Sequence, residues 1–187
     1  QLDATGNATI TAAQVNNGSS DNCGIANISL SKTTFNCTNI GANTVTLTVT
    51  DSNNNSATGT ATVTVQDVTN PNVIAKNATV SLGANGQVSI TPATVDNGTT
   101  DNCTFTMTVT PNTFGAANVG QNTVILVATD ASGNQSFKTA VVTIVDDTPP
   151  TVVTKNITVQ LDSTGNAAIT ADMINNGSTD NTSIASM

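Results

Sequence analysis

The sequence predicts an all-β protein made of tandem antiparallel β-sandwich modules of about 80 residues each. Apolar and polar side chains alternate strictly over 44–50 and again over 60–65, which is the period of a strand with one buried and one wet face. The same pattern returns at Asn122 after starting at Asn43, a shift of 79 residues. Thr, Val, Asn and Gly are abundant and strong helix formers are scarce, which favours strands and turns.

The alternating stretches form hairpins. A turn rich in Asp and Asn, 51–56, joins the first pair, and 130–134 joins the corresponding pair one repeat later. Each hairpin ends in an Asp-x-Thr-x-Pro tail, at 67–71 and, 79 residues later, at 146–150. Proline cannot donate to a continuing ladder, so these tails are predicted to link one module to the next.

A second motif occurs three times and therefore predicts three repeats. The segment 2–10 matches 82–90 and 161–169, and a strand precedes it at 77–81 and 156–160 but not in the first copy. We therefore predict a module at 1–66 that lacks its first strand, a complete module at 67–145 and the N-terminal part of a third at 146–187; these are called the first, second and third repeat below. Because repeat modules stack on neighbours, we expect a longer array.

The other elements follow in order. A loop with one helical turn near 12–15 is expected before a middle strand at 25–31, whose copy is 104–110. Six or seven short strands in about 80 residues are typical of a β-sandwich. In the hairpin of the first repeat the apolar side chains are predicted to face the core and the intervening threonines to face water: Val45, Leu47, Val49, Ala61, Val63 and Val65 inward.

The ordered set Asp-x-Thr-x-Pro, Asn-x-Thr-Val, Asp-Asn-Cys, Gly-x-Asn-Thr-Val and Asp-x-x-Gly-Asn resembles the hyalin-repeat (HYR-like) immunoglobulin-type modules of very long surface proteins, including adhesins of gliding bacteria. The resemblance covers the whole chain. It implies immunoglobulin-like sandwiches, secretion to the cell surface or the extracellular space, tandem arrays and adhesion. The expected partners are neighbouring modules of the same chain.

Composition excludes several functions. The chain has no His or Arg and a net charge of −8, which argues against nucleic acid and anionic membranes as partners. No run is long enough to insert in a membrane as a helix. Without His, neither a Ser-His-Asp nor a Cys-His pair is available, and a His/Cys zinc cluster is excluded. We therefore expect no enzymatic activity.

The aspartates are the strongest candidates for a ligand site. In an immunoglobulin-like module the B–C and F–G loops share one pole with the entering chain, and the short oxygen ligands there suit Ca²⁺. The alternative is that these side chains only cap turns. The candidate calcium ligands are Asp67, Asp96, Asp101 and Asp130 at the first junction, Asp146, Asp147 and Asp180 at the second, and Asp21 and Asp51 in the first repeat.

The three cysteines allow one pairing within a repeat. Cys23 and Cys37 both lie in the first repeat, whereas the second repeat has Cys103 and an alanine, Ala116, in the place of Cys37. We predict a Cys23–Cys37 disulfide and an unpaired Cys103; the alternative is two free thiols.

The sequence therefore predicts a non-catalytic structural or adhesive segment of a long secreted surface protein or extracellular filament. Two alternatives remain open. One is a self-assembling fibre subunit in which other copies supply a missing strand. The other is a carbohydrate-binding module for a surface glycan, although the lack of Trp and Tyr counts against stacking on sugars.

Overall fold

A computed structural model describes residues 1–187 of the chain. Contacts between Cα atoms divide it into two compact units. The first unit holds 1–73, 98–107 and 127–137, and the second holds 74–97, 108–126 and 138–187. Two segments of the second repeat, 98–107 with Asp101 and 127–137 with Asp130, thus belong to the same compact unit as the first repeat.

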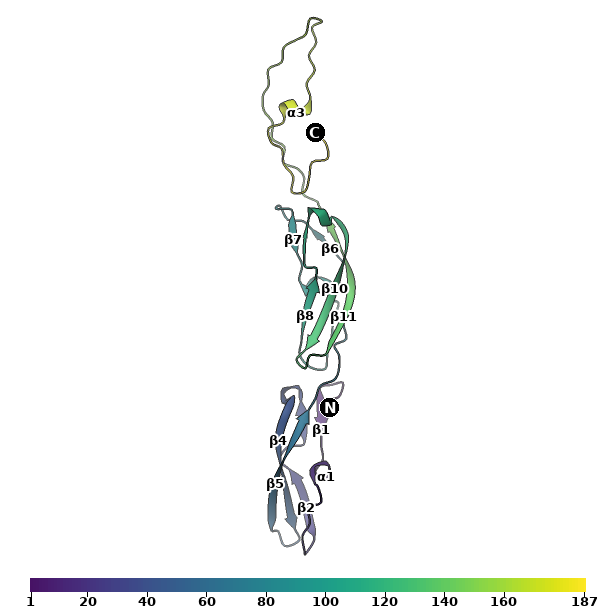
Figure 1. Ribbon diagram of the computed structural model, residues 1–187, viewed down its shortest axis with the longest axis vertical. Helices are drawn as coiled ribbons and strands as arrows, with labels where there is room; N and C mark the ends of the chain where they lie inside the picture. The colour runs from purple at the N-terminus through teal and green to yellow at the C-terminus, as the bar shows by residue number, and fades with distance from the viewer. The chain divides into compact units, whose positions relative to one another are not determined.

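The first two repeats have the same order of elements (Figure 1). The first repeat contains β1 (Asn7–Thr9), α1 (Ala12–Val15), β2 (Ile25–Leu30), β3 (Thr34–Asn36), the 3-10 turn η1 (Cys37–Asn39), β4 (Gly41–Asp51) and β5 (Ser56–Val65). The second contains β6 (Ala78–Ser81), β7 (Gln87–Ser89), α2 (Pro92–Val95), β8 (Phe105–Thr110), β9 (Thr113–Gly115), η2 (Ala116–Asn118), β10 (Gly120–Asp130) and β11 (Gln135–Val145).

The strands form a sandwich in each of the first two repeats, as predicted. In the first, β2, β4 and β5 make an antiparallel sheet, and β1 pairs with β3 in a second sheet. In the second, β6-β11-β10-β8 form one sheet and β7 pairs with β9 in the other. The first strand of the second repeat, β6, joins β11 in parallel. The protein is therefore all-β, with immunoglobulin-like sandwich modules.

The helical turns start in the same way. Thr11 and Thr91 cap α1 and α2 with a capping box, and Pro92 at the start of α2 has the backbone angle that a first helical turn needs. The helical turn predicted at 12–15 is confirmed. Both short helices lie within the loop that leads to the Asp-Asn-Cys segment.

The core of the first repeat is small and comes from both sheets: Phe35 from one, and Val45 and Val65 from the other, with Leu2 beside them. In β5 the predicted register is confirmed, because Ala61, Val63 and Val65 are buried or half-buried and the threonines between them are exposed.

In β4 the alternation holds only as far as Val45; beyond it, Leu47, Val49 and the threonines are all half-buried. An open groove of about 480 Å³ lies over this end and is lined by Leu47, Val49, Asp51 and Asp21, among others. In the second repeat the segment ahead of β7 supplies the buried Val73 and the paired strand β6.

The third repeat contains the helical turn α3 (Ala171–Ile174) and two isolated bridges, Thr151 with Thr179 and Thr154 with Asn175. The strand predicted at 156–160 does not form. Its counterpart in the second repeat, β6, pairs with β11, whereas no segment pairs with 156–160. A strand needs such a hydrogen-bonded partner.

No helix in the structure is both long enough and apolar enough to cross a bilayer.

Candidate metal centre

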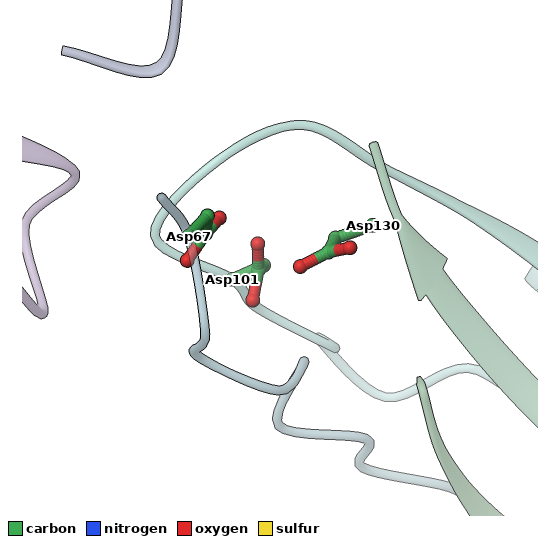
Figure 2. A group of neighbouring side chains, drawn as sticks. All are labelled: Asp67, Asp101 and Asp130. Atoms are coloured by element: carbon green, nitrogen blue, oxygen red, sulfur yellow. The ribbon is translucent and has the colours of Figure 1, made fainter. Parts of the chain in front are cut away.

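Three aspartates from three separate segments of the chain gather at one point in the first compact unit (Figure 2). Asp67 follows β5, Asp101 lies in the loop between α2 and β8, and Asp130 ends β10. One carboxylate oxygen from each lies within 4.8 Å of the other two. Asp67 and Asp130 are each only 6% exposed, and Asp101 is half-buried. The prediction that these three aspartates meet is confirmed.

Each carboxylate is held by its own turn, because an Asp side chain accepts readily from the backbone two residues on. Asp130 Oδ1 accepts from the backbone N–H groups of Ser132 and Asn134, both at 2.8 Å. Asp101 Oδ2 accepts from the N–H of Cys103 at 3.0 Å, and Asp67 Oδ1 accepts from Thr69 N at 3.1 Å. Turn capping and convergence therefore occur together; they are not alternatives.

Several oxygens at this point have no hydrogen-bond donor. Asp67 Oδ2, Asp101 Oδ1 and the amide oxygen of Asn102 are buried and unpartnered. A buried acceptor without a donor costs about 1 to 3 kcal/mol, and more when it is charged. Their common chemistry is that of hard oxygen ligands, two from carboxylates and one from an amide.

The electrostatics favour a cation. Two ionised carboxylates 4.8 Å apart repel by about 3 kcal/mol at an effective dielectric constant near 20. The donors that reach Asp67, Asp101 and Asp130 are neutral N–H groups, so none of them cancels this repulsion. A divalent cation would do so. A set made only of oxygens, with carboxylates and an amide carbonyl, suits Ca²⁺ better than a metal that prefers nitrogen or sulfur.

Two asparagines that were not among the predicted ligands also belong to this site. Asn102 Nδ2 donates to Asp67 Oδ1 at 3.2 Å, and Asn134 Nδ2 donates to Asp130 Oδ2 at 2.7 Å and to the carbonyl of Asp67 at 3.2 Å. The signal was present, since both asparagines belong to the repeated motifs Asp-Asn-Cys and Asp-x-x-Gly-Asn. Their side-chain N–H groups donate to other oxygens, and Asp67 Oδ2 and Asp101 Oδ1 remain without a donor.

The fourth aspartate predicted for the first junction is not part of this group. Asp96 ends α2, and its backbone bridges to Ala75. The three-carboxylate group is formed without it.

The second predicted set is brought together only in part. The hydroxyl oxygen of Thr182 lies 2.6 Å from Asp146 Oδ2 and 2.8 Å from Asp180 Oδ1, so its single proton lies between these two carboxylates. The bond from Thr182 is the main reason that the pKa of Asp146 is lowered. Asp147 instead accepts from the hydroxyl of Ser81. No third carboxylate joins Asp146 and Asp180.

In the first repeat, Asp21 and Asp51 line the same open groove but act as turn caps. Asp21 accepts from the N–H of Cys23 at 2.7 Å. Asp51 accepts from the backbone of Asn53 and Asn55 and from the side chain of Asn55, which is the leading reason that its pKa is lowered. Neither belongs to the three-carboxylate group.

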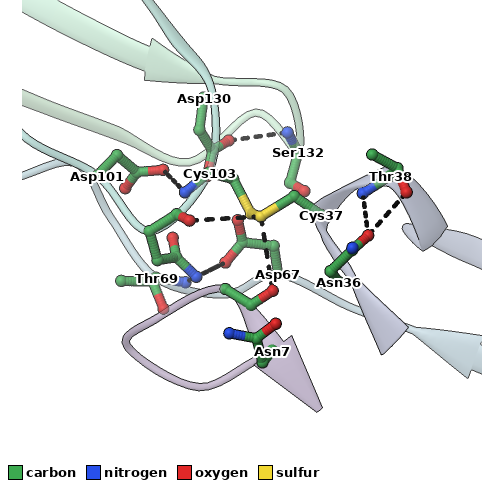
Figure 3. The surroundings of a disulfide bond; sticks show 12 residues. Asn7, Asn36, Cys37, Thr38, Asp67, Thr69, Asp101, Cys103, Asp130 and Ser132 are labelled. Carbon is green, nitrogen blue, oxygen red and sulfur yellow. Dashed lines mark hydrogen bonds between the residues drawn. A yellow bond between two sulfur atoms is a disulfide. The ribbon is translucent and has the colours of Figure 1, made fainter. Parts of the chain in front are cut away.

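A disulfide lies beside the three aspartates, and it is not the predicted one (Figure 3). It joins Cys37 to Cys103, with 5.7 Å between their Cα atoms, and Cys23 is a free, exposed thiol. The prediction of a Cys23–Cys37 bridge and an unpaired Cys103 was wrong.

The reason lies in the length of β4. Cys37 opens the 3-10 turn just before β4 begins, whereas Gly24, next to Cys23, bonds through its carbonyl to the N–H of Ser52 just after β4 ends. An 11-residue strand spans roughly 35 Å. A disulfide requires Cα atoms within about 7 Å, so these two cysteines cannot meet.

No protein-family model matches the chain, and no curated protein matches it significantly. Among solved structures, it is similar to extracellular cadherin domains 1–4 of protocadherin gamma B7, with a TM-score of 0.30 and 14% identity over 73% of this chain and 46% of that one. A second match is the EC3–6 cis-dimer structure of protocadherin gamma B7, with a TM-score of 0.28 and 14% identity over 60% and 34%. The chain spans less than half the length of either structure.

Proposed function

We propose that this chain is a non-catalytic, calcium-binding structural segment of an extracellular surface protein or filament, made of modules of the hyalin-repeat type. The observation that carries the proposal is the group of three converging carboxylates with its unpartnered oxygens. Those oxygens belong to residues that already hold their turns, so a cation could bind without refolding the loops.

The position of the site supports a structural role. Asp67 follows the last strand of the first repeat, whereas Asp101 and Asp130 come from the loops of the second. A cation bound by all three would tie the connecting segment to both loops within the first compact unit. Binding would therefore stabilise this unit by the amount set by calcium concentration and affinity.

The disulfide supports an oxidising, extracellular location. Cys37 and Cys103 join residues that are 66 positions apart, and such structural disulfides persist mainly outside the reducing cytosol. The resemblance of the repeated motifs to those of surface adhesins adds an adhesive role to this proposal.

The test is calcium binding by the full chain after treatment with a chelator. Because the chain has no Trp or Tyr, isothermal titration calorimetry and differential scanning calorimetry are the suitable measurements. We expect binding in the range of extracellular calcium modules, about 10⁻⁴ to 10⁻³ M, and a higher melting temperature with calcium. Magnesium at the same concentration should give a smaller shift, because it demands octahedral geometry.

Asp101→Asn is the diagnostic variant, since it removes one charge from the group, and we expect it to weaken binding at least about tenfold. Asp147→Asn is the matched control, because Asp147 bonds to Ser81 and lies outside the group; binding should be unchanged. An absence of heat and of any thermal shift at 10 mM calcium, roughly ten times the weakest expected constant, would overturn the calcium proposal.

A further inference from the structure

Cys23 is exposed and unpaired, and neither the cation site nor the core uses it. An exposed free thiol is unusual in a protein that forms a disulfide elsewhere, because an oxidising environment converts such thiols. Its position in the repeat explains what it could bind.

Cys23 occupies the same place in the first repeat as Cys103 in the second. Both end the sequence Asp-Asn-Cys, and both donate a backbone N–H to the Asp two residues earlier, at 2.7 Å and 3.0 Å. Cys103 is bonded to Cys37, a residue of the preceding repeat. In the second repeat, the cysteine in this position is therefore bonded to the residue that opens the 3-10 turn of the repeat before it.

The next pair of positions obeys the same rule. The counterpart of Cys37 in the second repeat is Ala116, which opens η2, and the counterpart of Cys103 in the third is Thr182. Both members of the pair are therefore replaced together. Cysteines occur at both positions or at neither, as expected if the two positions face each other.

In the second and third repeats, the asparagine just before this position makes a second contact of the same kind. Asn102 Nδ2 donates to the carbonyl of Asp3 at 3.1 Å, and Asn181 Nδ2 donates to the carbonyl of Gly83, the matching turn one repeat on, at 3.2 Å. Asn22 holds this position in the first repeat and is exposed. The Asp-Asn-Cys turn of the second repeat and its Asp-Asn-Thr counterpart in the third therefore both contact the repeat before them.

We propose that Cys23 is the attachment site for an inter-module disulfide, and that its partner is a further module of the same type with a cysteine at the position of Cys37. This inference rests on the proposed array of modules but not on calcium. The bond forms by exchange with a low-molecular-weight disulfide such as oxidised glutathione. The partner thiolate first forms a mixed disulfide with glutathione, and the Cys23 thiolate then displaces glutathione from it. In total two protein thiols are oxidised, one glutathione disulfide is reduced to two thiols, and the protons of the protein thiols end on glutathione.

The test supplies such a partner. Residues 1–80 are repeated directly before Gln1, which gives the original Cys23 a preceding repeat with its own Cys37. The chain is folded with reduced and oxidised glutathione, free thiols are alkylated, and trypsin is applied without reduction. Cleavage after Lys32, Lys76 and Lys138 puts the three cysteines on different peptides. The original Cys23 then lies on a unique peptide, 77–80 joined to 1–32.

We expect that unique peptide to be linked to peptide 33–76, whereas Cys23 of the added copy stays alkylated. Replacing the cysteine at position 37 of the added copy, Cys37→Ser, should free the original Cys23. Equal alkylation of both copies of Cys23 in the extended chain would overturn the proposal.

A second variant tests the pairing rule without extending the chain. In the double variant Ala116→Cys with Thr182→Cys, we expect a new disulfide between peptides 77–138 and 156–187, and Thr182→Cys alone should remain alkylatable. Two free thiols in the double variant would contradict the rule. Calcium titration of the same samples separates the two proposals, because loss of calcium binding leaves the disulfide result unaffected.

Discussion

The side-chain amide of Asn102 donates a hydrogen bond to the backbone carbonyl of Asp3, 99 residues earlier, over 3.1 Å. The same amide reaches Asp67, so one side chain connects the first turn of the chain to the three-carboxylate group. Asn181 repeats the contact to Gly83 in the second compact unit. The recurrence indicates that this contact is a general feature of the repeat.

Asn102→Asp should destabilise the first compact unit in the presence of chelator. The substitution replaces an amide that donates to two oxygens with a carboxylate that only accepts, beside Asp67 and Asp101. We expect a loss of about 1 to 3 kcal/mol, measured by urea unfolding followed by circular dichroism. Asn17→Asp, at an exposed position, is the control and should change stability by less than about 0.5 kcal/mol. Equal effects of the two variants would show that Asn102 does not hold this contact.

Gly6→Ala should be more damaging than an ordinary glycine substitution. A Cβ on Gly6 would lie 2.5 Å from the backbone oxygen of Asn102 and 2.8 Å from Cys37 Sγ, so backbone or disulfide would have to move. Gly18 is the matched control, because it also has a positive φ, +81° against +75°, but nothing within 4 Å. We expect Gly18→Ala to cost about 1 kcal/mol, from the left-handed backbone alone. Gly6→Ala should cost at least about 1 kcal/mol more, from overpacking. Similar melting temperatures for the two variants would contradict the close approach.

Loss of the Cys37–Cys103 disulfide should lower stability because it releases a closed loop. In the chain-entropy model, a loop between residues 66 apart is worth about 4 kcal/mol. Cys37→Ser should therefore lower the melting temperature of the chain by several degrees in scanning calorimetry. Cys23→Ser removes a thiol that is not bonded and should leave the melting curve unchanged. Reductant should lower the melting temperature of the unmodified chain but not that of Cys37→Ser, which has no disulfide to reduce. Equal shifts in the two proteins would show that the disulfide does not cause the difference in stability.

Asp51 should make the first repeat sensitive to acid. The side chain of Asn55 is the main cause of the lowered pKa of Asp51, and the backbone N–H groups of Asn55 and Asn53 add to it. Because the pKa is lower in the folded state, the contribution is fully present above the unfolded value, about 3.9, and is lost as pH falls through the folded value.

Carboxyl NMR should accordingly show the midpoint of Asp51 below about 3.9. Asp51→Asn keeps an acceptor at the turn but removes the titration, so its stability should fall less between pH 5 and pH 2. A normal midpoint for Asp51 would exclude this turn as a source of acid sensitivity.

The sequence alone determined what depends on local periodicity and turn chemistry. The alternation in β5, the hairpins around Asp51 and Asp130 and the helical turn after Thr11 are encoded within a few residues, and all formed as expected. The convergence of Asp67, Asp101 and Asp130 also followed, because immunoglobulin-like topology places their loops at one pole.

Only the tertiary structure decided which distant groups meet. The length of β4 separates Cys23 from Cys37, although they are close in sequence, and the approach of the Asp-Asn-Cys turn to the preceding repeat brings Cys103 to Cys37. The strand expected at 156–160 did not form, because a strand needs a hydrogen-bonded partner that a local pattern cannot supply. Side-chain periodicity is set by neighbours in sequence, whereas pairing of cysteines, strands and carboxylates is set by distances that the whole fold imposes.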